Sequence, residues 1–172
     1  MLLNRLGAHD RALFHKVLLS RTNSRVWRRI AVALTHLGGA RVSIALASWP
    51  LLLEGRWQGL GEHALATLAL SHVLVQIVKR SVSRARPSCG ELVECLVDEP
   101  DRFSFPSGHA AASFAVALSF ATVLPGVAVP VIVIAGAVGA SRVVLGVHYP
   151  GDVAVGQTLA LATHFALIRA GV

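Results

Sequence analysis

The sequence has few charged side chains for its length. Only 15% of its 172 residues are charged, 54% are hydrophobic, and the mean hydropathy is +0.63. An ordinary soluble domain has about 25% charged residues. The shortage of charge, without repeats or low-complexity segments, excludes disordered, coiled-coil and collagenous chains and favours a protein of the lipid bilayer. The length accommodates one domain with about five or six membrane spans.

Cysteines and aromatic residues are also scarce. The two cysteines, Cys89 and Cys95, have five residues between them, which fits neither a CxxC redox pair nor a zinc quartet. A disulfide between them would imply an oxidising compartment, and two free thiols are the alternative. Aromatic residues make up 6% of the chain, and none interleaves with a basic stretch. The sequence therefore gives little support to a single-stranded nucleic-acid surface, and we expect no nucleic-acid partner.

Positive charge is in excess, with 16 Lys and Arg against 9 Asp and Glu, and it is concentrated near the N-terminus. Residues 1–29 hold seven basic side chains and a single acidic one, Asp10. Apolar residues recur between them at helical spacing, at Leu13, Phe14, Val17 and Leu18. This pattern predicts a basic amphipathic N-terminal arm over residues 1–29 that lies on an anionic membrane surface. A solvated basic arm is the alternative. The basic residues of the arm are Arg5, Arg11, Lys16, Arg21, Arg25, Arg28 and Arg29.

Five apolar stretches follow the arm, at about residues 30–53, 60–78, 109–124, 127–147 and 153–168. The first contains His36 and Arg41, and a charge in mid-membrane is costly, so a start near Ala40 would move both to the interface. Backbone groups in lipid must bond within their own segment, which leaves helices. We predict an all-α polytopic membrane helix bundle over residues 30–172, with five transmembrane helices, or six if the N-terminal helix also inserts.

Several polar and aromatic residues lie within or beside these stretches. The histidines are expected to bond neighbouring helices, as polar side chains in membrane bundles do. They are His36, His63, His72 and His164. Trp27, Trp49 and Trp57 flank the first stretch and are expected to be interfacial anchors.

One polar loop, about residues 79–108, interrupts the apolar pattern. If the helices alternate in direction, the ends near Lys79, His109, Val147 and Asp152 fall on the same side of the membrane. Cations, two histidines and a carboxylate would then converge at a water-facing rim. The residues brought together are Lys79, Arg80, Arg84, Arg86, Ser107, Gly108, His109, Ser141, Arg142, His148 and Asp152.

This set of side chains suits phosphate chemistry. Arginine donates two parallel hydrogen bonds to phosphate, lysine adds a point charge, and the helix that begins near His109 exposes unpaired N–H groups at Ser107 and Gly108. Asp152 follows His148 by four residues and would fix its tautomer, leaving the other ring nitrogen free to attack phosphorus. His109 would protonate the leaving oxygen.

The same residues resemble the three signature motifs of the type 2 phosphatidic acid phosphatase superfamily. The first is Lys79, six residues and Arg86-Pro87, and the second is the run from Pro106 to His109. The third is Ser141-Arg142, five residues, His148, three residues and Asp152. The resemblance implies a membrane phosphatase that works through a phosphohistidine without a metal or cofactor. By matching position His148 is the nucleophile, Asp152 its orienting partner and His109 the general acid. The phosphate would be held by Lys79, Arg86, Ser107, Gly108 and Arg142.

The expected function is hydrolysis of a lipid phosphate or lipid pyrophosphate, such as phosphatidic acid, phosphatidylglycerophosphate, undecaprenyl pyrophosphate or lipid A. The alternative is a non-catalytic membrane protein that binds anionic lipid head groups. A soluble haloperoxidase-like relative is disfavoured because the apolar stretches are as hydrophobic as membrane-spanning helices and are not amphipathic. The expected location is the bacterial cytoplasmic membrane, with the face of the site left open. Typical membrane members of the family have three helices before the second motif, whereas two apolar stretches precede it in this chain, with the arm in place of the first.

Overall fold

The computed structural model describes residues 2–21, 24–87, 97 and 101–172. Cys89 and Cys95 lie outside these residues, and so does the expected choice between a disulfide and free thiols. All the elements named in the described parts of the chain are helices, which agrees with the predicted all-α class. In order they are α1 Leu2–Arg21, α2 Arg25–Leu37, α3 Ala40–Ser48, η1 Trp49–Leu52, α4 Arg56–Val82, α6 Gly108–Val123, η2 Pro125–Val127, α7 Ala128–Val144 and α8 Pro150–Ala170.

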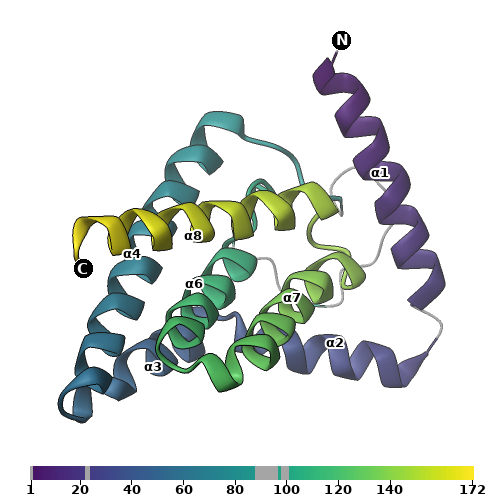
Figure 1. Cartoon of the computed structure of the whole chain (residues 1–172). Coiled ribbons are helices and arrows are strands. Elements are labelled where there is room, and N and C mark those ends of the chain that lie inside the picture. Colours follow the sequence, from purple (N-terminus) through teal and green to yellow (C-terminus); the bar gives the residue numbers. More distant parts are fainter. Residues whose placement is uncertain (1, 22–23, 88–96, 98–100) are drawn as a thin grey trace.

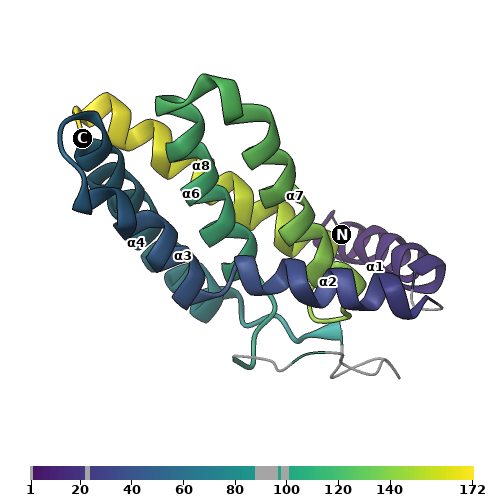
Figure 2. The ribbon, with the colours of Figure 1, turned by 90° about the horizontal axis from the view of Figure 1, so that it is seen from below.

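Helix α6 lies at the centre of the bundle and packs against α3, α4, α7 and α8 (Figures 1 and 2). Its buried alanines, among them Ala110, Ala111 and Ala115, allow neighbouring helices to approach closely. Gly156 of α8 is needed at this crossing, because a Cβ there would lie 2.5 Å from the carbonyl oxygen of Ser107. The start of α6 is therefore pressed directly against α8.

Three helical segments are long and apolar enough to cross a membrane: α4, Pro125–Val144 and α8. A fourth candidate is the pair α2 and α3–η1, which is bent by 52°. Helix α6 is also apolar, but it has only 16 residues. The described residues thus form a helical membrane bundle with three or four spans by length and composition, and the predicted count of five is not established by this criterion.

The bend between α2 and α3 lies at Gly38 and Gly39, inside the first predicted span. A Cβ on Gly38 would lie 2.9 Å from the carbonyl oxygen of His109 and 2.6 Å from Val138. The bend therefore fits closely against the first turn of α6. Helix α3 begins at Ala40, the position at which the sequence placed a later start of the span.

Helix α1 packs against the end of the bundle at which α7 passes into α8 (Figure 1). Phe14 is fully buried, and its ring lies edge-on to that of Tyr149 with centroids 5.3 Å apart. Val17 and Leu18 pack on the same cluster. Part of the apolar face that the sequence assigned to a membrane surface is thus covered by protein. Helix α2 begins at Arg25 and continues past Arg29, the predicted end of the arm.

Two of the four histidines predicted to bond neighbouring helices do so. His63 of α4 and His164 of α8 are 2.9 Å apart between ring nitrogens, and His164 lies 3.1 Å from the Thr122 hydroxyl of α6. His72 instead faces Gln76 of its own helix at 3.4 Å. The His63–His164 pair ties three helices together near the C-terminal end of α8, away from the rim residues.

Candidate active site

The first predicted motif folds around Asp101. Lys79, in the last turn of α4, donates to Asp101 Oδ2 at 2.7 Å, and Arg86 Nη2 donates to Asp101 Oδ1 at 3.0 Å. Arg86 Nε also donates to the backbone oxygen of Asp101 at 2.8 Å. Burial alone would raise the pKa of Asp101, but the Lys79 ammonium and the Arg86 guanidinium outweigh it and lower the pKa. Asp101 is therefore a carboxylate that holds the two cations together.

Arg86 also joins the first motif to the third. Its Nη1 donates to the carbonyl oxygen of Val147 at 2.8 Å and lies 3.3 Å from Nε2 of His148. The side chain of Arg86 is almost completely buried. The end of α4 and the loop between α7 and α8 therefore meet on one side of the bundle, as alternating helix directions predicted.

His148 lies in the short loop between α7 and α8, beside the carboxylate of Asp152. Its Nδ1 is 3.5 Å from Asp152 Oδ2. That oxygen accepts the N–H of Tyr149 at 2.9 Å, and Oδ1 accepts from Arg84 Nη1 at 2.7 Å. Burial lowers the pKa of His148 to about 4, although Asp152 opposes the shift. The imidazole is thus neutral at neutral pH, with Nε2 facing away from the carboxylate.

The second motif forms the start of α6. The hydroxyl of Ser107 caps the helix by accepting a hydrogen bond from the N–H of Ala110. The backbone N–H of Ser107 donates to the carbonyl oxygen of Asp152 at 2.9 Å. A Cβ on Gly108 would meet no heavy atom within 4 Å, so the space beside this helix start is open. His109 follows, within electrostatic range of Arg142 and His148. Ser107 thus positions the start of α6 against Asp152, and the backbone at Gly108 has open space beside it.

Arg142 brings α2 into the site. Its Nη1 donates to the Thr35 hydroxyl at 2.5 Å, and both side chains are buried. Ser141 donates to the Val138 carbonyl in its own helix, α7. Both residues were expected at the water-facing rim. Arg142 is instead buried inside the bundle, and the hydroxyl of Ser141 bonds only within α7 among the contacts described.

Four contributors to this cluster were not assigned to the site from the sequence: Asp10, Thr35, Arg84 and Asp101. Arg84 is within the spacer of the first motif, two residues before Arg86, and was counted only among the rim cations. Asp101 was one of several acids in the polar loop. Their partners are between 15 and 141 residues away along the chain. Local spacing carries no signal for such pairs.

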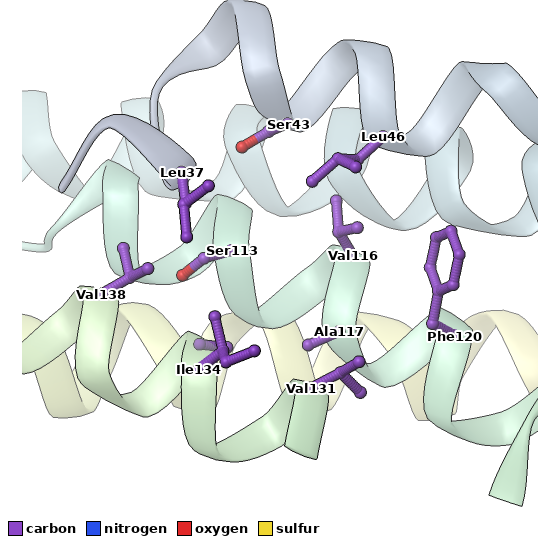
Figure 3. A pocket seen from close by; sticks show the side chains of 11 residues that line it. Leu37, Ser43, Leu46, Ser113, Val116, Ala117, Phe120, Val131, Ile134 and Val138 are labelled. Atoms are coloured by element: carbon purple, nitrogen blue, oxygen red, sulfur yellow. The ribbon is translucent and has the colours of Figure 1, made fainter. Parts of the chain in front are cut away.

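A mostly apolar groove runs along α6 between α3 and α7 (Figure 3). One end of it is near His109, because Val138 of its lining and the backbone of His109 both lie against Gly38. The volume of the groove is about 300 Å³. On α6 its wall continues the face that carries His109, because Ser113 and Ala117 follow at intervals of four residues. It opens between α3 and α7 past the exposed side chains of Leu46 and Ile134. The lining residues are Leu37, Ser43, Leu46, Ser113, Val116, Ala117, Phe120, Val131, Ile134, Ala135 and Val138.

Comparison with known proteins agrees with this geometry. Residues 62–171 match the PAP2 superfamily, and this segment contains all three motifs. The chain belongs to the PAP2 superfamily. A decaprenylphosphoryl-5-phosphoribose phosphatase of Mycolicibacterium smegmatis is 37% identical over 131 residues, covering 73% of this chain and 69% of the relative. Phosphatidylglycerophosphatase B of Bacillus subtilis is 30% identical over 185 residues, covering 94% and 83%.

The match to other PAP2 relatives is partial. The Mycobacterium tuberculosis decaprenylphosphoryl-5-phosphoribose phosphatase is 42% identical over 92 residues, and the chain spans about half of that relative's length, 49%.

Among solved structures, a transmembrane PAP2 type phosphatidylglycerolphosphate phosphatase from Bacillus subtilis has a TM-score of 0.77 at 26% identity, covering 98% of this chain and 87% of that one. Helices α1 to α3 lie before the segment that matches the superfamily.

Proposed function

We propose that this protein is an integral membrane phosphatase that releases phosphate from a lipid phosphate or lipid pyrophosphate through a phosphohistidine. One observation carries this function: a neutral, buried His148 lies between Asp152 and Arg86, at the side of the bundle where the three motifs meet. A non-catalytic head-group binder would need the cations, but it would not need a histidine held against a carboxylate in this way.

In the proposed reaction, Nε2 of His148 attacks phosphorus, a nitrogen–phosphorus bond forms and the bond to the lipid oxygen breaks. His109 gives its proton to that leaving oxygen. Water then attacks phosphorus, His109 takes a proton from it, and the nitrogen–phosphorus bond breaks to release phosphate and restore His148. The contact of Arg86 Nη1 with Nε2 would pass to a phosphate oxygen when the substrate binds.

The charge on the phosphate oxygens would be met by cations and backbone N–H groups. Lys79, Arg86 and Arg142 supply the cations, and the open start of α6 at Gly108 supplies the N–H groups. Ser107 would act mainly by holding that helix start against Asp152. In this proposal the cations and the backbone N–H groups stabilise the charge that develops on the phosphate oxygens during phosphoryl transfer.

The substrate class follows from the relatives and from the groove. The relatives bear the names of phosphatases acting on decaprenylphosphoryl-5-phosphoribose and phosphatidylglycerophosphate. Their shared chemistry is a phosphate on a molecule with long hydrocarbon chains. We therefore assign a lipid phosphate of this kind to the present chain, in the cytoplasmic membrane of a bacterium.

For the topology we propose five spans: the bent pair α2 with α3–η1, then α4, α6, α7 and α8. The short α6 fits this count because it is surrounded by the other helices. With five alternating spans, the C-terminal ends of α4 and α7 and the N-terminal ends of α6 and α8 lie at one membrane face, where the site residues are.

The function is tested with full-length protein purified in detergent and assayed in the presence of a chelator. We expect phosphate release from at least one of phosphatidic acid, phosphatidylglycerophosphate, undecaprenyl pyrophosphate and lipid A, because no step needs a metal. Released phosphate is measured against protein-free detergent. Binding of these lipids without any release would favour the non-catalytic alternative, and activity that disappears with the chelator would contradict the metal-independent mechanism.

The groove is the proposed place for a hydrocarbon chain of the substrate. It continues from the face of His109, is lined mainly by apolar side chains and opens between α3 and α7, past the exposed Leu46 and Ile134, on a side that lipid would cover. Its volume of about 300 Å³ is at the lower end of ligand pockets, which suits part of one chain rather than a whole lipid.

Filling the groove should affect long-chain substrates selectively. We expect Ala117→Leu to lower kcat/KM for a long-chain lipid phosphate by about tenfold, because the added methyl groups occupy the chain's space. Its rate on a short-chain, water-soluble phosphate ester should stay within about twofold of the wild-type rate. Val133→Leu is the control, because Val133 is 63% exposed on α7 and does not line the groove. Equal losses on both substrates would contradict this placement of the chain.

A further inference from the structure

The N-terminal helix reaches the candidate active site although it lies outside the segment that matches the PAP2 superfamily. Asp10 of α1 accepts the backbone N–H of Gly151 through Oδ1 at 2.7 Å. Its Oδ2 lies 2.8 Å from Nη1 of Arg84. Asp10 thus bonds to the first turn of α8 and to the spacer of the first motif.

Arg84 connects Asp10 to the carboxylate beside His148. The same Nη1 that meets Asp10 donates to Asp152 Oδ1 at 2.7 Å, and the Asp152 side chain is completely buried. The guanidinium also lies over the ring of Tyr149, 4.0 Å from its centroid. A buried carboxylate needs its oxygens bonded in order to keep one orientation. Arg84 therefore fixes which oxygen of Asp152 points to His148.

The docking of α1 is supported by packing as well as by charge. Phe14 follows Asp10 by one helical turn, so both side chains lie on the same face of α1. Phe14 is completely buried against Tyr149, the residue whose N–H also bonds to Asp152. Helix α1 thus contacts both residues, Arg84 and Tyr149, that hold the two oxygens of Asp152.

We propose that Asp10 is a positioning residue for the His148–Asp152 pair, acting through Arg84 and Gly151. This role rests on the proposed function, because the geometry it maintains is that of the nucleophile. Asp10 touches neither the phosphate nor the reacting nitrogen. Its removal should therefore change the rate of the chemical step and leave substrate binding nearly unchanged.

The test compares Asp10→Asn with Ala12→Asn, which places the same side chain on an exposed position of α1. For Asp10→Asn we expect kcat for lipid phosphate hydrolysis to fall about tenfold, since a small misalignment of a reacting group has effects of this order or larger. KM should change less than about twofold, and Asp10→Glu should recover part of the lost kcat. Ala12→Asn should match the wild type.

A double variant separates positioning from general destabilisation of α1. We expect Arg84→Gln to lower kcat further than Asp10→Asn does, and the combination Asp10→Asn with Arg84→Gln to lose less than the product of the two single losses, because both act on Asp152. Melting temperature in detergent is measured for every variant, and Asp10→Ser replaces Asp10→Asn if the latter does not fold.

The two proposals fail in different ways. Wild-type protein that releases no phosphate from any tested lipid contradicts the proposed function. Active wild-type protein with wild-type kcat in folded Asp10→Asn or Asp10→Ser contradicts the positioning role alone. Losses that multiply in the double variant, or a loss that appears only in KM, also overturn it.

Discussion

His148→Ala is expected to reduce phosphate release from a lipid phosphate by at least about 10⁴-fold, the scale at which removal of a nucleophile acts. The reason is that no other described side chain combines a neutral nitrogen with a carboxylate partner at this site. His148 is buried, its pKa is lowered to about 4, and its Nδ1 faces Asp152, which leaves Nε2 as the proposed attacking atom. Initial rates of phosphate release in detergent measure the effect.

The matched control for this variant is His164→Ala. His164 is also a buried histidine, but it bonds to His63 and Thr122 far along α8 from the site. Its replacement should leave kcat within about threefold of wild type while lowering the melting temperature, because it removes two cross-helix hydrogen bonds. Acid-labile phosphate trapped on the wild-type protein, and absent from His148→Ala, would identify the phosphohistidine. A folded His148→Ala protein that keeps several per cent of the activity would exclude His148 as the nucleophile.

Much of the fold and the site could be predicted because the informative signals were local in sequence. The apolar stretches matched α4, α7 and α8. The cost of placing Arg41 in lipid suggested a later start of the first span near Ala40, and α3 begins at that residue, but the bend between α2 and α3 was not predicted. The convergence of Lys79, Arg86 and His148 followed from alternating helix directions, and Arg86 does contact His148. Alternation depends only on the number of membrane-crossing helices between two motifs. Between the second and third motifs the described residues contain the apolar helices α6 and α7, joined by the short η2, as the two predicted apolar stretches implied.

The residues that the sequence did not assign depend on tertiary contacts. Asp10 had the appearance of a single acid in a basic arm, and nothing near it in the chain indicated Arg84 or Gly151. Asp101 similarly could not be distinguished from other acids of the polar loop until the structure showed it between Lys79 and Arg86. A charge run predicts a surface, whereas the bonding of one of its members to a buried partner depends on how distant helices pack.

The apolar face of α1 illustrates the same limit. Leu13, Phe14, Val17 and Leu18 have the spacing of an amphipathic helix, and that spacing is equally suited to lipid and to a protein surface. In the structure Phe14 is buried on Tyr149, whereas Leu13 is 52% exposed. Periodicity thus predicted that α1 has an apolar side, and only packing could decide that part of this side covers the candidate site.

Asp152→Asn is expected to lower kcat by about 10²- to 10⁴-fold, the range seen when the carboxylate partner of a catalytic histidine becomes an amide. Asparagine has nearly the same shape, so the fold should be retained. However, its side chain carries no charge to pair with Arg84 and no longer imposes the tautomer that leaves Nε2 of His148 free. The measurement is kcat for phosphate release, with melting temperature as the check on folding.

The pH dependence of Asp152→Asn distinguishes loss of orientation from a change in protonation. Asp152 raises the pKa of His148, so its removal should lower that pKa further below about 4. The proposed nucleophile, His148, is active when deprotonated, and activity that depends on it is lost only as the pH falls through its pKa. Between pH 5 and 8 the pH is therefore at least about one unit above the pKa of His148 in the variant, and the imidazole is neutral over this whole range. The defect should persist across this range, and recovery of wild-type kcat at high pH would show that Asp152 acts by setting the charge of His148 rather than its orientation.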